Sequence, residues 1–261
     1  MKKKQTGLTR AAVRDLFVAE LARRGVACGP TEDGACRVET PAGALTVTLE
    51  NLARDLARDQ DEARVTRFVD VVLAPTEVLP WREAQGHVYW CIESAAQEFD
   101  DTIRADVSDK VARVLVVTDA EERRITWLAP GQIGRWKTSR DTVEQAAFAN
   151  LDALLARSPP PEVTDVRGAK LGMLPVSSSF KASVLFAPAF RTYVEPVLGW
   201  PVLATVPSRD FIYVIPESDR ELLGAMGHVI QREFRESSYP ISTEVLRLSD
   251  EGIEAIGAFP E

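Results

Sequence analysis

Residues 201–216 read PVLATV-PSRD-FIYVIP, two short apolar runs on either side of a four-residue turn. Short apolar runs bounded by turn signals are typical of strands, and a tight turn between two of them predicts a β-hairpin. A helix-period segment follows at residues 219–236, and another strand-like run lies at residues 243–248. A hairpin, a helix and a strand in this order bury one face of a sheet under a helix. The stretch therefore places the chain in the α+β class.

The first quarter of the chain predicts a helix, a β-hairpin and a second helix. Apolar residues recur at helix spacing over residues 8–24, where Thr9 is a candidate N-cap. Two strands are predicted at residues 36–39 and 44–49, and helix spacing returns over residues 51–73. We therefore expect a helix–β-hairpin–helix layer at the N-terminal end.

The middle of the chain mixes strand and helix signals. The pattern predicts strands at residues 87–92, 113–118, 124–128 and 170–176, and helices at residues 94–103, 141–156 and in patches over 180–198. Together with residues 201–248, these elements predict a mixed or antiparallel sheet with helices packed on one face.

Two breaks in the pattern indicate boundaries. Prolines interrupt residues 74–80, and three consecutive prolines follow Ser158, where they end a helix and favour an extended spacer. We divide the chain into a helix–hairpin–helix region at residues 1–75, a central α/β region at 84–157 and a C-terminal α+β region at 163–261. These regions form either separate domains or one composite fold.

Composition narrows the classes of function. The net charge is −8 and the isoelectric point is about 5.1, whereas a sequence-independent nucleic-acid binder needs a basic face. No apolar run approaches the roughly 18 residues of a membrane span. The lysines at residues 2–4 resemble the start of a signal peptide, but Arg10 and Arg14 interrupt the apolar segment that should follow. We expect a cytoplasmic protein that binds neither nucleic acid nor a membrane.

The cysteines and histidines do not form a recognisable metal motif. Cys28 and Cys36 flank a turn-rich segment and could meet across a hairpin, whereas Cys91 lies far along the chain. We interpret Cys28 and Cys36 as two small, semi-buried thiols of a cytoplasmic protein. The chain has two histidines and no Cys-x-x-Cys pattern, so we predict neither a zinc site nor a cofactor.

A set of short sequence pieces recurs in a fixed order through the second half. The pieces are Trp136, EQAAFANL at 144–151, FKAS at 180–183, VPSRD at 206–210, EF at 233–234 and PIS at 240–242. In order and spacing they resemble the bacterial YtpQ-like family of uncharacterised proteins, over about residues 113–257. The resemblance implies an α+β fold and brings no activity, cofactor or partner with it.

One segment resembles a catalytic motif. Residues 178–181 read Ser-Ser-Phe-Lys, the Ser-x-x-Lys pattern of penicillin-recognising serine enzymes, in which one helical turn brings the amine beside the hydroxyl. Residues 137–139 are close to the Lys-Thr-Gly of those enzymes but precede the serine, and no Ser-Asp-Asn lies between them. Serines before an apolar run are also typical of a helix N-cap, and we interpret these as capping residues.

Five residues are candidates for binding. Arg209 and Asp210 crown the predicted hairpin, where a short charged tip suits recognition of a partner, although a local ion pair would also explain them. Asn150 lies beside the apolar stripe of its helix, and we expect it to adjoin a groove with Trp136. The leading hypothesis is a non-catalytic module that binds a protein or a small ligand. The competing hypothesis is a hydrolase or transferase in which Ser183 converges with Asn150, Arg209 and Asp210.

Overall fold

The computed structural model describes residues 9–30, 36–40, 43–47, 49–74, 79–97, 101–120, 122, 124–237 and 239–261. It confirms the α+β class, with antiparallel sheets and packed helices. The chain divides into two compact units, Met1–Val78 and Leu79–Glu261. The boundary between the units lies within the predicted break at residues 74–80, whereas residues 158–161 lie inside the second unit.

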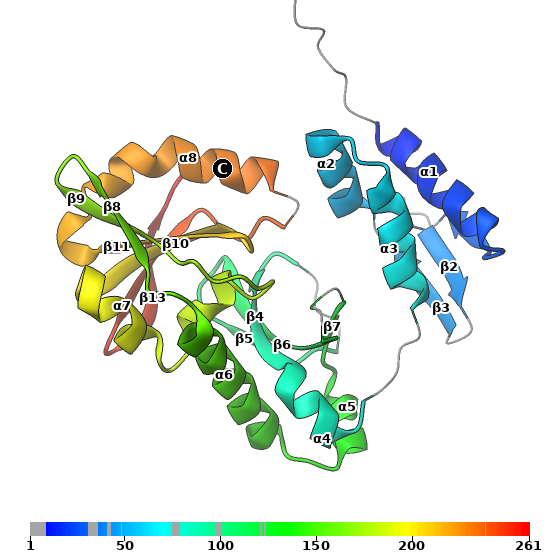
Figure 1. The fold of residues 1–261 in the computed structure, drawn as a ribbon, viewed down its shortest axis with the longest axis horizontal. Helices are drawn as coiled ribbons and strands as arrows, with labels where there is room; N and C mark the ends of the chain where they lie inside the picture. The colour runs from blue at the N-terminus through cyan, green and yellow to red at the C-terminus, as the bar shows by residue number, and fades with distance from the viewer. Residues whose placement is uncertain are drawn as a thin grey trace, which may run out of the picture. The chain divides into compact units, whose positions relative to one another are not determined.

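The first unit contains a three-stranded antiparallel sheet and three helices (Figure 1). Thr9 caps the first helix, because its Oγ1 accepts a hydrogen bond from the Ala12 amide at 3.2 Å. The apolar side chains that the elements bury together are Val13, Phe17, Leu21, Cys36, Val38, Val47, Leu52, Leu56, Val65 and Val69. The elements, in chain order, are α1 Arg10–Arg23, β1 Cys28–Pro30, β2 Cys36–Thr40, β3 Gly43–Val47, α2 Glu50–Asp59 and α3 Ala63–Leu73.

The single helix predicted over residues 51–73 is in fact two helices. Gln60 has a φ of 55°, in the left-handed region, and this conformation ends α2. Asp61 Oδ1 then accepts a hydrogen bond from the Ala63 amide at 3.1 Å, which supports the start of α3. Both helices keep the apolar spacing of the pattern, so the interruption is carried by the polar residues between them.

The second unit contains two antiparallel sheets and the remaining helices. Its elements, in chain order, are α4 Trp81–Ala84, η1 Gln85–His87, β4 Val88–Ser94, β5 Arg104–Asp106, β6 Val111–Thr118, β7 Ile125–Trp127, α5 Pro130–Trp136, α6 Arg140–Arg157, β8 Glu162–Val166, β9 Ala169–Met173, η2 Ala182–Phe186, α7 Phe190–Leu198, β10 Val202–Ser208, β11 Phe211–Pro216, η3 Glu217–Asp219, α8 Leu222–Glu236, β12 Glu244–Ser249 and β13 Gly252–Ala258.

The smaller sheet is built around β6. This strand pairs with β4 on one side, and with β5 and then β7 on the other. Figure 1 shows α6 lying beside β4, and Trp90 of β4 packs against Phe148 of α6 with the ring centroids 6.1 Å apart. The residues that alternate with Trp90 point away from α6, as the two-residue period of a strand requires.

The larger sheet has the strand order β13-β12-β10-β11-β9-β8, and its two central strands are the predicted hairpin. Helix α8 buries Leu222, Met226 and Ile230 with Leu203 and Ile215 on one face (Figure 1). The prediction had one sheet with helices on one face. The structure has two sheets, and α7 lies on the second face of the larger one, where Val194 and Leu198 join the main core with Val202 and Val214.

Some elements lie outside the sequence prediction. Of the helix expected at residues 94–103, the described residues 94–97 and 101–103 form the end of β4 and turns. Strand β8, which forms a hairpin with β9, and the last strand β13 were not predicted, because neither carries a continuous apolar run. The pairing of β12 with β13 shifts register between Val245 and Leu246, which leaves Ile256 as an extra residue in β13.

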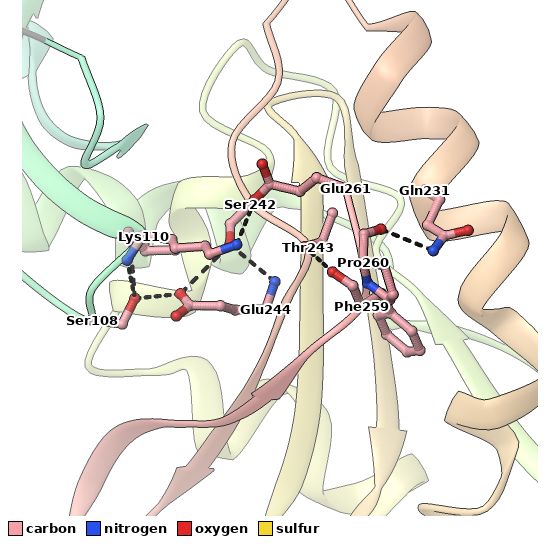
Figure 2. A network of polar contacts seen from close by, with 10 residues as sticks. Ser108, Lys110, Gln231, Ser242, Thr243, Glu244, Phe259, Pro260 and Glu261 are labelled. Carbon is pink, nitrogen blue, oxygen red and sulfur yellow. Dashed lines mark hydrogen bonds and ion pairs between the residues drawn. The ribbon is translucent and has the colours of Figure 1, made fainter.

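A polar network joins the two sheets of the second unit (Figure 2). Ser108, in the turn before β6, donates a hydrogen bond to Glu244 Oε2 of β12 at 2.5 Å, and Lys110 Nζ lies 2.5 Å from Glu261 Oε1. Thr243 Oγ1 donates to the Phe259 carbonyl at 2.7 Å, so the chain after β13 continues alongside the residue that precedes β12. These contacts fix the smaller sheet against the edge of the larger sheet that β12 and β13 form.

Candidate functional site

Strand β4 carries a buried carboxylate in an otherwise apolar run. Every residue from Val88 to Glu93 is buried, and the Glu93 side chain is only 3% exposed. Its Oε1 accepts hydrogen bonds from Arg209 Nη2 and, at 3.4 Å, from Trp127 Nε1. Glu93 belongs to the smaller sheet and Arg209 to the β10–β11 turn of the larger one. The ion pair therefore fastens the tip of the predicted hairpin to the other sheet.

Arg209 points inward, although it occupies a hairpin tip. Its side chain is 16% exposed, and its guanidinium lies 4.8 Å from the centre of the Tyr239 ring. Burial works to lower the pKa of Arg209, but the electrostatic influence of Cys91, Glu93 and Tyr239 raises the pKa overall. The Nε atom is buried and has no hydrogen-bond partner among the described residues.

Cys91 lies on the same face of β4 as Glu93, and Ser183 of η2 contacts the strand between them. The Cys91 thiol is 3.7 Å from Glu93 Oε1, and the Ile92 amide donates to Ser183 Oγ at 2.9 Å. We call Cys91, Glu93, Ser183 and Arg209 the Glu93 cluster. Burial raises the pKa of Cys91 to about 12, so the sulfur is a thiol at neutral pH and a poor nucleophile. The cluster therefore stabilises the contact between the two sheets and is poorly suited to covalent chemistry.

The outward side of the same hairpin tip is polar and aromatic. Asp210 is exposed, Phe211 is 42% exposed and Tyr239 is 38% exposed. The Arg209 amide donates to the Tyr239 carbonyl at 3.2 Å, and the adjacent Pro240 bridges to Ser208. We call Asp210, Phe211 and Tyr239 the tip surface. Backbone contacts on one side and the Arg209–Glu93 pair on the other hold it in place.

The other two predicted binding residues serve the local structure. Asn150 Nδ2 donates to the Gln85 and Val88 carbonyls, at 2.9 and 2.7 Å, and so fastens α6 to the start of β4. Trp136 is buried, donates from Nε1 to the Leu79 carbonyl at 2.8 Å and packs on Trp81. Of the five candidates, the structure brings Ser183 and Arg209 together on β4, and Asp210 lies beside Arg209 but faces outward.

The Ser-x-x-Lys segment is a loop anchored by a carboxylate. Glu122 Oε2 accepts hydrogen bonds from Ser178 Oγ at 2.8 Å and from the Ser179 amide at 2.7 Å. Ser178 Oγ also accepts from the Phe180 amide at 3.1 Å, which is a local turn contact. The N-cap of η2 is Lys181 and has no side-chain cap bond, so the prediction that these serines cap a helix was wrong. Both serines are engaged in this loop, which packs the Phe180 ring on Tyr89 at 4.2 Å.

Sequence reasoning missed Glu93 and Cys91. The signal that could have found them is the charge of Glu93 at the end of the run VYWCI, because a carboxylate in a buried strand requires a cationic partner. The arginine of the PSRD turn was already a candidate, but its partner lies 116 residues earlier in the chain. Such a pairing has no local signature.

Comparison with known proteins identifies no relative: no family model, no curated protein and no solved structure matches this chain. The resemblance to the YtpQ-like family therefore stays a prediction. Within the described part of the chain, no helix has the length and apolar character needed to cross a bilayer. The same residues hold no cluster of three or more His, Cys, Asp or Glu side chains that would suit a metal ion.

Proposed function

We propose that this protein is a non-catalytic binding module that recognises a partner protein through the tip surface. The observation that carries the proposal is the inward Arg209. A two-residue hairpin turn normally directs an arginine into water, whereas here its charge is spent on an internal pair with Glu93. That pair leaves Asp210, Phe211 and Tyr239 outside, on a turn that both sheets hold.

A rigid tip favours binding for an entropic reason. Ordering a mobile loop on binding costs free energy, about 0.5–1.5 kcal/mol for each immobilised side chain, and a surface held beforehand avoids part of that cost. Aromatic side chains are enriched in interfaces, where they bury large areas with few rotatable bonds. Phe211 is also backed by the Tyr213 ring at 6.4 Å, which limits its motion. Asp210 adds a charge that selects against acidic partners.

The competing hydrolase or transferase hypothesis is less well supported. It requires Ser183, Asn150, Arg209 and Asp210 to converge on one point, whereas Asn150 bonds to carbonyls at the start of β4 and Asp210 is exposed. Ser183 Oγ accepts a hydrogen bond from the Ile92 amide, and the nearby Cys91 has a raised pKa. The carboxylate beside Cys91 is that of Glu93, which is paired with Arg209 and therefore poorly placed to act as the base that activates a nucleophile.

We further propose that the protein works in the cytoplasm. Burial raises the pKa of the Cys28 thiol to about 11, and the neighbouring Cys36 adds to this rise. Both are free thiols. An oxidising compartment tends to join neighbouring thiols, so the proposal predicts that both stay reduced in the cell.

Site-directed photocrosslinking tests the binding proposal. A benzophenone amino acid replaces Phe211 in one variant and Val163 in another, because Val163 is 39% exposed on β8 and lies outside the tip surface. Irradiation of cells that produce each variant is expected to yield a discrete protein adduct from position 211 and none of that mass from position 163. The adduct should disappear when Asp210→Arg is added to the first variant.

Two outcomes would refute the proposal. One is the same adducts from both positions, which would indicate random collisions. The other is an absence of any adduct at position 211 in a variant that circular dichroism shows to be folded. An adduct that survives Asp210→Arg unchanged would remove Asp210 from the recognition surface.

A further inference from the structure

Arg113 occupies an unusual position in the middle of the smaller sheet. It lies on β6, opposite Ile92 of β4, on the face that α6 covers. Its guanidinium carbon is 4.8 Å from the centre of the Trp90 ring and 5.5 Å from the centre of the Phe148 ring. Two aromatic faces on different elements therefore hold the cation by cation–π contact.

The guanidinium lacks an acceptor. A guanidinium has five N–H donors, and within the described part of the chain Arg113 forms no hydrogen bond or ion pair. The charge of the Glu144 carboxylate acts on Arg113, but this carboxylate pairs with Arg140. Glu144 Oε1 lies 2.5 Å from Arg140 Nε. Burial lowers the pKa of Arg113, and the charge of Glu144 offsets this only in part. The guanidinium is thus half-buried, and none of its donors is matched by an acceptor among the described residues.

A second donor on the same face is also unmatched. Trp90 is completely buried, and its Nε1 has no hydrogen-bond partner among the described residues. Buried donors are nearly always paired in native proteins, so an unpaired one calls for a physical reason. Here the indole and the guanidinium beside it both lack an oxygen acceptor, and Arg113 is partly exposed and can be reached from solvent.

We propose that Arg113 anchors a binding site for a small oxyanion, the carboxylate or phosphate group of a small ligand. The two rings restrain the guanidinium, and the partial exposure of Arg113 makes the side chain accessible to a ligand. An oxyanion in the plane of the guanidinium accepts two parallel hydrogen bonds, the geometry in which arginine recognises carboxylates and phosphates. Because the stack already orders the side chain, binding does not have to do so.

The site is independent of the tip surface. Arg113 lies on the α6 face of β4 and β6, whereas Glu93 and the hairpin tip lie on the residues of β4 that alternate with Trp90. A variant at Arg113 therefore leaves the Arg209–Glu93 pair in place. Success or failure of either proposal leaves the other open to its own test.

Side-chain NMR tests the site directly. Spectra of the arginine Nε–H groups are recorded while sodium acetate or inorganic phosphate is added, with sodium chloride at matched ionic strength as the reference. We expect the Arg113 signal, assigned by its absence in Arg113→Met, to move along a saturating curve with at least one of the two anions and not with chloride. Acetate and phosphate distinguish a carboxylate ligand from a phosphate ligand.

Three variants complete the experiment. Arg113→Met fills the space between the rings without the charge, and its indole signals should no longer respond to either anion. Arg113→Lys keeps the charge but loses the planar fork, so its affinity should fall about tenfold. Arg232→Met is the control, because Arg232 is 53% exposed on α8 and pairs with Glu233, so this substitution leaves Glu144 paired with Arg140, and its affinity should equal that of the native protein.

The result that overturns the proposal is an Arg113 signal that neither anion shifts in a saturable way. Equal shifts with chloride would also overturn it, because they would show general screening. Thermal unfolding gives a further criterion. In the absence of anions, Arg113→Met should unfold at or above the unfolding temperature of the native protein, because the substitution removes an unmatched charge. A large drop in that temperature would show that the arginine serves the fold instead.

Discussion

Removal of Arg209 is the change that most directly tests how the hairpin tip is held. Arg209→Met leaves the Glu93 carboxylate 3% exposed and without its cation, with only the Trp127 and Cys91 contacts. Two charges about 3 Å apart attract by roughly 5 kcal/mol at an effective dielectric constant of 20, and loss of one partner of a buried pair typically costs about 3–5 kcal/mol. We expect Arg209→Met to lower the free energy of unfolding by about 3 kcal/mol.

The opposite change should cost less. Glu93→Gln leaves the guanidinium on the Tyr239 ring and 16% exposed, and the amide oxygen still accepts one hydrogen bond. We expect a loss of about 1–2 kcal/mol. In the double variant the buried charge is gone, so it should be more stable than Arg209→Met alone. This reversal of order is the distinctive result.

Tryptophan fluorescence during urea unfolding provides the measurement. All five tryptophans lie beyond residue 78, so the signal reports the second unit without contribution from the first. Arg232→Met is the control, because Arg232 is 53% exposed and pairs with Glu233 at the surface, and its effect should stay within about 0.5 kcal/mol. A double variant less stable than Arg209→Met would refute the buried-charge reasoning, and so would a loss below about 1 kcal/mol for Arg209→Met.

Three further changes have defined outcomes by the same measurement. The pKa of Cys91 rises from an ordinary 9.0 to about 12, so the protonated thiol stabilises the folded state fully below pH 9, and this contribution is lost as the pH rises towards 12. The urea midpoint should therefore fall between pH 9 and 12, and it should fall less in Cys91→Ala. Gly172→Ala should cost about 1–3 kcal/mol, because its Cβ would lie 2.6 Å from Leu198 Cδ1, whereas Gly224→Ala in α8 meets no atom within 4 Å and should be neutral or stabilising. Asn150→Ala should cost about 1–3 kcal/mol, since it removes both hydrogen bonds to backbone carbonyls; a loss within error would show that water replaces them.

The elements with strong local signals were predictable from sequence. The hairpin at residues 201–216 combines two apolar runs with a turn tetrad, and Thr9 stands at a helix start with the side chain that a cap requires. The helix at residues 51–73 was placed correctly but not divided, because nothing in the apolar spacing marks the left-handed Gln60. Local periodicity thus gives the element type, and polar capping decides where it ends.

Sheet membership could not be read in the same way. Which strand pairs with which depends on contacts between distant segments, such as Ser108 with Glu244, 136 residues apart. The same limit applies to the site. Arg209 and Ser183 were identifiable as unusual residues, but the residues of β4 that they contact, Glu93 and Ile92, lie far away in sequence. Asn150 looked equally unusual, and the carbonyls that explain it, at Gln85 and Val88, lie 65 and 62 residues earlier in the chain.

The outer strands of the larger sheet have a consequence for how the molecule behaves at high concentration. An unprotected border strand invites pairing with a foreign chain and so seeds aggregates. Strand β8 meets this hazard with its acidic Glu162 and Asp165, which repel a second copy of the same border. Strand β13 has one carboxylate, and its extra Ile256 interrupts the even spacing of backbone groups that an incoming strand would need. One border is thus guarded by charge and the other by irregular geometry.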